Sequence, residues 1–349
     1  MTPLRILHVA NLNQFKYGAW YMNLDAKLSM GLCQLGHAVY NVSHRDMARA
    51  EGLFKSKALG TKAMLKGLRT TVLNFKPELV VLGHSELIDL STLKELRAML
   101  PGVPFVMWYC DPMLPTDGVE YEVPILNERS SVLDVIFTTS GVDPLNEITQ
   151  GRCTIAHVPN WIHAGCESGQ AYASSRFTND LIYAGTDYEL TDRKALLQGL
   201  VDSEIGPRFK LFQALGNPRV HGNAYYSALG ESLMGLSISR RYNIPWYSSD
   251  RMQQMMGNGL CTISPRTPGL TELFKEDELV WFDDQNEIID LVKWHVANPD
   301  VAKEVAERGW RAAHARCSAD RVAKFMLELA FDKPLSEDYE WSSQVIPAS

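Results

Sequence analysis

Short apolar runs alternate with longer amphipathic segments through the first half of the chain. Residues 20–35, for example, carry leucines at helical spacing and end before Gly36, a residue that suits the end of a helix. Strands alternating with helices are typical of a parallel sheet covered on both faces, so a first domain is expected over residues 1–164. Its strands are predicted at 5–12, 38–43, 79–83, 105–110, 132–139 and 154–158.

The alternation stops after residue 164 and then begins again. Residues 165–179 are mostly small and polar and are typical of a linker. A second domain is expected over 180–331, its last helices packing back on the first domain, with a polar tail at 332–349. The predicted fold class is α/β, with two Rossmann-like doubly wound domains facing a cleft. The strands expected in the second domain are 180–185, 209–215, 234–239, 260–265 and 278–282.

Composition and charge narrow the classes of function. The chain has 349 residues, more than one core usually supports, which agrees with two domains. A formal net charge of −7 argues against a globally basic surface for nucleic acid, so no nucleic-acid partner is expected. The six cysteines are scattered without a C-x-x-C pair, and no metal site is expected.

The expected location is the cytoplasm. Residues 1–10 contain a short apolar run followed by polar residues, unlike a secretory signal peptide. No run of the sequence approaches the roughly 18–20 apolar residues that a transmembrane helix needs.

Two common nucleotide-binding motifs are missing from the sequence. No G-x-G-x-x-G follows the first strand, which weighs against a dinucleotide-dependent dehydrogenase, and no G-x-x-x-x-G-K-[ST] indicates a P-loop NTPase. Ligands of open α/β sheets bind beyond the carboxyl ends of the strands, near helix N-termini. Candidate ligand-binding residues are therefore expected at the carboxyl ends of the strands and near the N-termini of the helices that follow them.

Motifs of the second half resemble the donor domain of GT-B glycosyltransferases. Residues 181–186, followed by 192–197, are similar to the strand, loop and helix that open this domain. Residues 250–259 resemble the nucleotide-sugar helix of the CgeB-like (spore-maturation-type) subgroup of the group 1 glycosyl transferases, and 268–274 resemble its G-x-x-E stretch. The resemblance implies a GT-B architecture and a nucleoside-diphosphate sugar as donor substrate.

One departure from the family pattern concerns the reaction. Related retaining transferases carry two glutamates eight residues apart, and the corresponding positions here are Trp246 and Gln254. Gln254 can still hydrogen-bond a ribose, because an amide both donates and accepts. The choice between retention and inversion of the anomeric centre stays open.

Basic residues are the first candidates for the donor site. Arg251, near the start of a predicted helix, would bind the diphosphate with its charged fork and stabilise the leaving group, or it would pair with Asp250 at the surface. Arg193 and Lys194 begin the helix after Gly185. Basic side chains at a helix start oppose the helix dipole unless an anion is bound there, so they support the same anion site.

Further donor-side candidates follow two later strands. Glu272 lies behind the turn that contains Gly269, where its carboxylate would accept hydrogen bonds from sugar hydroxyls or simply favour a helix start. Arg240, just after a predicted strand, is a candidate for phosphate or base contacts. With Tyr242 and Trp246 nearby it would equally form a packed edge.

The acceptor side is expected in the first domain. Asp111 ends an apolar strand in the sequence Tyr-Cys-Asp-Pro and is a candidate general base for the acceptor hydroxyl, or a turn residue. His84 follows another buried strand and is the rival base, with a pKa naturally near the working pH, or a structural histidine. Gly18, in the loop after the first strand, would let an acceptor or phosphate approach the backbone.

A basic segment offers a membrane contact. No acidic residue occurs from Gly52 to Pro77, and the segment 55–76 contains Lys55, Lys57, Lys62, Lys66, Arg69 and Lys76. The second part of this segment has an apolar stripe made of Leu65, Leu68, Val72 and Phe75. This stripe would either lie on an anionic membrane at the inner face of the cell or pack in the core of the domain.

These features predict transfer of a sugar from a nucleotide-sugar donor to a hydroxyl group of a glycan or glycolipid acceptor. The resemblance implies a place in bacterial surface polysaccharide, lipopolysaccharide or glycoconjugate synthesis. No D-x-D motif occurs, so the reaction is expected to be metal-independent and to need no cofactor. Two alternatives stay open: a nucleotide-sugar epimerase on the same fold, and a non-catalytic nucleotide- or glycan-binding protein.

Overall fold

The computed structural model describes residues 2–111, 122–187, 192–239 and 244–349 of the chain. They form two compact units, one running to Pro159 and including Ala319–Ser349, the other made of Asn160–Ser318. The division differs from the predicted domains in two places. The first unit ends at residue 159, before the expected linker at 165–179, and residues 319–331, expected in the second domain, belong to the first unit.

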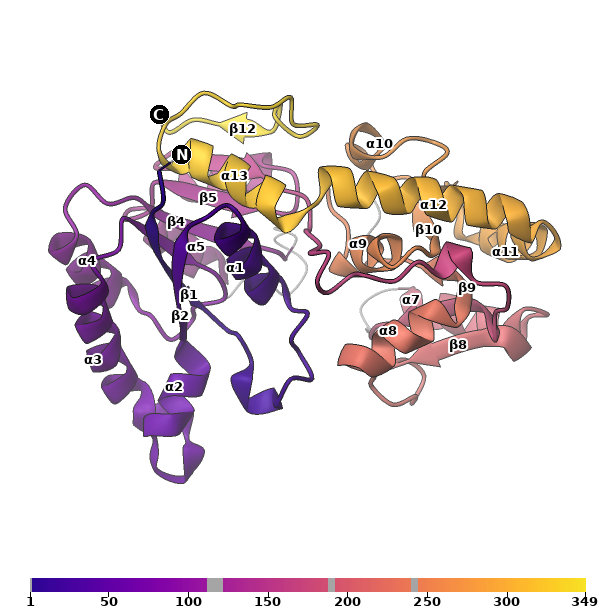
Figure 1. Ribbon diagram of the computed structural model, residues 1–349, viewed down its shortest axis with the longest axis horizontal. Coiled ribbons are helices and arrows are strands. Elements are labelled where there is room, and N and C mark those ends of the chain that lie inside the picture. Colours follow the sequence, from indigo (N-terminus) through magenta and orange to yellow (C-terminus); the bar gives the residue numbers. More distant parts are fainter. Residues whose placement is uncertain (1, 112–121, 188–191, 240–243) are drawn as a thin grey trace. The chain divides into compact units, whose positions relative to one another are not determined.

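The sheet of the first unit is parallel except for one short strand (Figure 1). Its strand order is β12-β6-β5-β4-β3-β1-β2, and β12 pairs antiparallel with β6. Strands β3, β4 and β5 are buried along their whole length, as the apolar runs predicted. The bounds are β1 Arg5–Ala10, β2 Ala38–Ser43, β3 Leu79–Leu82, β4 Phe105–Tyr109, β5 Val135–Thr138, β6 Thr154–His157 and β12 Val345–Ile346.

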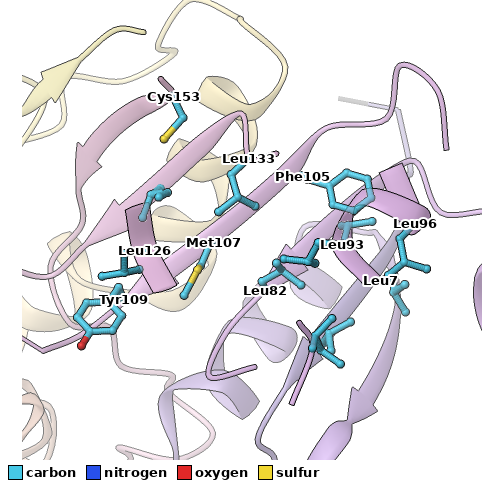
Figure 2. Packing of buried hydrophobic residues seen from close by; sticks show 14 of the residues in the cluster. Leu7, Leu82, Leu93, Leu96, Phe105, Met107, Tyr109, Leu126, Leu133 and Cys153 are labelled. Carbon is cyan, nitrogen blue, oxygen red and sulfur yellow. The ribbon is translucent and has the colours of Figure 1, made fainter. Parts of the chain in front are cut away.

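Helices cover both faces of this sheet. Helices α3 to α6 contribute leucines, valines and methionines to a core with β1 and β3–β6, and Figure 2 shows Phe105 and Met107 of β4 close to Leu93 and Leu126 from two of these helices. Helices α1 and α13 pack on the opposite face. The helices are α1 Leu24–Gln34, α2 His44–Glu51, α3 Lys57–Phe75, α4 Leu90–Met99, α5 Glu122–Arg129, α6 Asp143–Thr149 and α13 Ala319–Ala330.

The end of the chain is part of the first unit. Helix α13 lies against α1 so closely that a Cβ atom on Gly31 of α1 would be 2.4 Å from the carbonyl carbon of Ala319. Beyond α13, Tyr339 and Trp341 are 1% and 0% exposed and pack their rings against Phe325. The segment 332–349, predicted as a polar tail, is held on the first unit by these aromatic rings, which supply the apolar area that fastens it.

The second unit has a smaller, wholly parallel sheet of order β11-β10-β9-β7-β8. Residues 165–179 are not a linker between units: they lie within this unit, where the backbone N–H of Ala171 donates to the carbonyl of Asn258. The strands are β7 Asn179–Ala184, β8 Phe209–Phe212, β9 Ser232–Leu236, β10 Cys261–Pro265 and β11 Val280–Phe282. The helices are α7 Arg193–Asp202, α8 Gly222–Gly230, α9 Asp250–Gly257, α10 Leu270–Leu273, α11 Ile288–Ala297 and α12 Pro299–Arg316.

Candidate active site

Arg251 lies in the first turn of α9, and its guanidinium is held beyond the ends of two neighbouring strands of the second unit. Its Nη2 donates to the carbonyl oxygen of Ile238, just after β9, at 2.8 Å. Its Cζ lies 5.4 Å from the ring centre of Tyr183, in β7. A Cβ atom on Gly185, which directly follows β7, would be 2.9 Å from Nη1. The predicted place of Arg251, at the carboxyl edge of the sheet, is confirmed.

The guanidinium of Arg251 has no carboxylate partner among the residues that the structure describes. The alternative of a pair with Asp250 is not found, since the carboxylate of Asp250 accepts instead from the amide of Gln254 at 3.0 Å. The Nε–H of Arg251 is buried without a hydrogen-bond acceptor in the described part of the chain. A buried donor on a permanent cation is costly unless an acceptor is supplied, and an anionic ligand would supply one.

Arg193 contacts the loop after β7, which Arg251 also approaches. These two arginines, with Tyr183 and Gly185, are called the Arg251 cluster. It is buried at the start of α7, and its Nη1 donates to the carbonyl oxygen of Thr186 at 3.0 Å. The hydroxyl of Tyr183 donates to that oxygen as well, also at 3.0 Å. Since Arg251 stacks on the ring of Tyr183, two guanidinium groups meet around this loop, whereas the adjacent Lys194 is exposed.

Gln254 and Gly269 both have close contacts within the second unit. Gln254 is 5% exposed, and its side-chain amide is engaged within α9 by Asp250. Gly269 has a φ angle of +85°, and a Cβ atom there would lie 2.5 Å from the ring of Trp246. The requirement for glycine thus comes from its backbone angle and from the buried indole.

Two other predicted donor residues are not brought into the cluster by any described contact. Glu272 is exposed on the four-residue helix α10, and its side chain makes no hydrogen bond to the described residues. Arg240 lies outside the described residues.

The first unit places His84 in a chain of polar groups. His84 follows β3, and its Nδ1 lies 3.6 Å from a carboxylate oxygen of Asp25, in the first turn of α1. The same carboxylate accepts from the indole N–H of Trp108 at 2.9 Å and lies 3.5 Å from Nε2 of His8. The other ring nitrogen of His84 lies 3.4 Å from Sγ of Cys110, at the end of β4. Asp25 thus holds His84 by one nitrogen and leaves the other beside the thiol.

This arrangement favours the charged forms of both Asp25 and His84. Burial raises the pKa of Asp25, but hydrogen bonds from His8 and His84 outweigh it and bring the pKa down to about 2. Burial likewise lowers the pKa of His84, but the hydrogen bonds to Asp25 and Cys110 and their negative charges raise it to about 11. The pKa expected near the working pH was therefore wrong, because the sequence does not reveal the buried carboxylate. His84 carries a proton at neutral pH.

Asp111 and Gly18 are both present near the carboxyl edge of the first sheet. Asp111 is half-buried and directly follows Cys110, two residues after β4. Gly18 is exposed in the loop after β1, with a φ of +87° and no atom within 4 Å of the place of a Cβ atom. The turn alone therefore requires a glycine there.

Residues that sequence reasoning missed are Asp25, Tyr183 and Cys110. A carboxylate on the buried side of α1, among Leu24 and Leu28, was a detectable signal, because buried carboxylates need partners. Tyr183 and Cys110 had no comparable signal, since both occur within apolar strand patterns.

Comparison with known proteins identifies the fold of this chain. Residues 189–328 match the family described as glycosyl transferase-like. Among solved structures, α,α-trehalose 6-phosphate synthase from Burkholderia multivorans superposes with a TM-score of 0.58 and 11% identity, over 95% of this chain and 97% of that one. The β-glucosyltransferase of phage T4 superposes with a TM-score of 0.57 and 13% identity, over 94% of this chain and 100% of that one. The chain therefore has the GT-B fold that these glycosyltransferases share. The predicted α/β class is confirmed.

A third similar structure carries a nucleotide. The Anabaena protein HepE, solved in complex with UDP, superposes on this chain with a TM-score of 0.55 and 9% identity, over 94% of this chain and 100% of that one. No curated protein sequence matches the chain. None of the helices in the described part of the chain has the length and apolar character needed to cross a bilayer. The described residues also contain no group of three His, Cys, Asp or Glu side chains placed to hold a metal ion.

Proposed function

We propose that this glycosyltransferase moves a sugar from a nucleoside-diphosphate sugar to a hydroxyl group of a glycan or glycolipid. The observation that carries the proposal is the guanidinium of Arg251, held beyond β7 and β9 without a carboxylate partner in the described residues. It lies within the part of the chain that matches the glycosyl transferase-like family. Complexes of HepE with UDP-glucose and of the T4 enzyme with its UDP-glucose substrate support a uridine nucleotide as the first donor to test.

In the proposed reaction, the bond between the anomeric carbon and the diphosphate oxygen breaks while the acceptor oxygen bonds to that carbon. Negative charge develops on the departing diphosphate, and a positioned guanidinium stabilises it. Arg251 supplies the free N–H donor, and Arg193 adds a second positive charge at the loop after β7. Glu272, Lys194 and, outside the described residues, Arg240 are kept as proposed donor contacts.

The acceptor hydroxyl must lose its proton as the new bond forms. His84 is poorly suited to take it, because its pKa of about 11 keeps the ring protonated. We therefore assign the base to the carboxylate of Asp111 and a cationic, positioning role to His84, oriented by Asp25. Gly18 is kept as a proposed acceptor-side residue.

The finer classification and the metal requirement are part of the same proposal. The pattern around Arg251 supports membership of the CgeB-like subgroup, and with it a role in bacterial surface polysaccharide or lipopolysaccharide synthesis. No D-x-D motif is present in the sequence, and the two arginines provide positive charge where metal-dependent transferases use a cation. The reaction is proposed to need neither metal nor cofactor.

Thermal unfolding in the presence of different nucleoside diphosphates tests the donor site. At a concentration 100 times its dissociation constant, a ligand stabilises the native state by about 2.7 kcal/mol, so the preferred diphosphate should raise Tm by several degrees. The shift should be unchanged by a chelator. If no diphosphate raises Tm, the donor proposal is wrong; if a chelator abolishes the shift and manganese restores it, metal independence is wrong.

Product analysis then separates the remaining functions. A transferase releases the diphosphate in proportion to the acceptor glycosylated. Conversion of the sugar without any acceptor would identify an epimerase, and saturable nucleotide binding without turnover over a broad acceptor panel would identify a binding protein.

The apolar stripe of the basic segment is not available for a membrane contact. Of the apolar stripe on α3, Leu68 and Val72 are buried in the core of the first unit, with Met64 beside them. That stripe is therefore not free to enter a membrane. Of the two alternatives for the stripe of 55–76, packing in the core of the domain is the one found, because the helix uses its apolar face to cover the sheet.

The tip that precedes α3 exposes apolar side chains instead. Leu53, Phe54 and Leu59 are 72%, 96% and 63% exposed, and Phe54 has a left-handed φ of +55°, which is unusual for an aromatic residue. Tyr17, 85% exposed, lies in the loop whose Phe15 ring is 5.9 Å from Nζ of Lys55. The cations in these two segments and at the start of α3 are Lys16, Lys55, Lys57 and Lys62.

We propose that this tip, residues 53–59 with Tyr17, contacts an anionic lipid surface from which a glycolipid acceptor would be drawn. Exposed apolar side chains with lysines in the same segments favour binding to an anionic lipid surface. The protein should co-sediment with vesicles containing anionic lipid and not with purely zwitterionic vesicles. Burying one such side chain is worth about 1.5–3 kcal/mol, so L53S/F54S should lower the partition coefficient at least about tenfold.

Leu73→Ser is the matched control, because Leu73 is 62% exposed near the other end of α3. It should bind vesicles as the original protein does. Equal binding to both kinds of vesicle, or an equal loss in the control, would remove the tip from the proposal.

A further inference from the structure

Cys110 differs in its surroundings from the other five cysteines. Four of them, Cys153, Cys166, Cys261 and Cys317, are buried, and Cys33 is exposed on α1. Cys110 alone is half-buried, and its Sγ lies 3.4 Å from Nε2 of His84. The residue is therefore partly exposed, and its thiol is in contact with an imidazole.

The imidazole is itself oriented by a carboxylate. Nδ1 of His84 lies 3.6 Å from Asp25, which is buried and accepts a hydrogen bond from Trp108. A nucleophile, an imidazole and an orienting carboxylate in this order form the arrangement that activates cysteine nucleophiles in unrelated folds. Here three different elements contribute: Asp25 from α1, His84 from the end of β3 and Cys110 from the end of β4.

The charges around the pair favour the thiolate. Since Asp25 and Cys110 hold a proton on His84, the imidazolium in turn stabilises negative charge on the adjacent sulfur. Among the residues that the structure describes, other titratable groups near the pair include His8, beside Asp25, and His44, whose Nε2 contacts the backbone oxygen of His84 and lies 3.5 Å from Glu86. Asp111 follows Cys110 directly, and the guanidinium of Arg129 donates to the backbone oxygen of Ser85.

The buried cysteines show the opposite environment. Burial is the largest cause that raises the pKa of Cys153, and the sole cause for Cys261, in both cases to about 12, which keeps these thiols protonated and inert. They provide an internal standard against which Cys110 can be compared in one experiment.

We propose that Cys110 is a nucleophilic thiolate and a site of reversible thiolation by small disulfides. The sulfur attacks one sulfur of the disulfide, so that a mixed disulfide forms, the original S–S bond breaks, and the other half leaves as a thiolate. A second small thiol reverses the exchange. Because Asp111 is the next residue, the attached group lies beside the proposed base, and thiolation blocks glycosyl transfer; this last consequence rests on the proposed function.

Site-resolved alkylation by iodoacetamide tests the thiolate without any need for turnover. An ordinary thiol loses on the order of 100-fold in rate between about pH 8 and pH 6, because its thiolate fraction falls. Peptide mass spectrometry should show that Cys110 loses less than about tenfold over this range, measured beside the exposed Cys33 as the reference. Cys153 and Cys261 should stay unlabelled, which reports that the protein is folded.

His84→Gln should bring the pH profile of Cys110 to that of Cys33, since glutamine carries no charge. If Cys110 already follows Cys33 in the original protein, or keeps its profile in the variant, the thiolate proposal is overturned. If Cys153 becomes labelled in His84→Gln, that variant is unfolded, and His84→Asn is then used in the same experiment.

Oxidised glutathione tests the regulatory step. It should add one glutathione at Cys110, none in Cys110→Ser, and a small thiol should remove it. The adduct should abolish glycosyl transfer while nucleoside-diphosphate binding persists. An adduct that leaves transfer intact overturns the blocking step alone, whereas a protein that never binds nucleotide contradicts the proposed function and leaves the thiolate standing.

Discussion

Replacing Arg251 by alanine is expected to weaken nucleoside-diphosphate binding by about 10- to 100-fold. A hydrogen bond to a charged group contributes about 1.5–3 kcal/mol, and each 1.4 kcal/mol is about tenfold in affinity. The side chain is placed to make such bonds, because its guanidinium is fixed by Ile238 and Tyr183 and retains a free Nε–H among the described residues. Isothermal titration with the preferred diphosphate measures the effect.

Two further variants separate charge from geometry. Arg251→Lys keeps the charge but loses the planar fork, so it should recover only part of the affinity. Gly185→Ala leaves Arg251 in the chain, but its Cβ atom would be 2.7 Å from the Tyr183 hydroxyl and 2.9 Å from Nη1 of Arg251. It should displace the guanidinium and reduce affinity.

Gly199→Ala is the control for the glycine change. Gly199 lies inside α7 with no atom within 4 Å of a new Cβ atom, so this variant should keep its affinity and gain about 0.5–1 kcal/mol of stability. Unchanged binding in both Arg251→Ala and Gly185→Ala would remove the Arg251 cluster from the donor site.

Replacing Asp111 by asparagine is expected to lower kcat by about 100- to 10,000-fold, the usual contribution of a general base. The amide has nearly the same size but does not take the acceptor proton. Because Asp111 belongs to the first unit and the Arg251 cluster to the second, the affinity for the nucleoside diphosphate should not change. Steady-state rates and titration calorimetry on the same preparation test both statements.

Asp143→Asn is the matched control, since Asp143 is an exposed carboxylate in the first turn of α6 in the same unit. It should retain full turnover. If Asp111→Asn also retains full turnover, Asp111 is a turn residue. If instead its nucleotide affinity falls together with kcat, the variant has disturbed more than a proton transfer, and the assignment of a base is contradicted.

The sequence predicted the sheets well because buried parallel strands have a simple signature. Apolar runs such as 79–83 and 105–110 have no polar face, and they correspond to β3 and β4, buried throughout. The membership of residues 319–349 was not predictable in this way. Which unit α13 and the aromatic residues Tyr339 and Trp341 join depends on contacts with α1 and β6, far away in the sequence.

Candidate site residues could be predicted where their place beside a strand or at a helix start was enough to identify them. Arg251 and His84 were found because each follows a recognisable strand or begins a recognisable helix. The state of His84 was not predictable, because its pKa depends on Asp25, which lies 59 positions earlier and reaches it only in the folded unit. The packing around Gly269 was likewise not predictable, since the indole beside it comes from Trp246.

The return of the chain to its first unit has a consequence for the order of folding during synthesis. Residues 160–318 form a continuous segment, so the second unit can close as soon as that segment has left the ribosome. The first unit cannot, because α1 must wait for α13 to cover it and β6 must wait for β12. The half of the protein that is begun first is therefore completed last, and until then the face of its sheet beside α1 stays open to water and to other chains.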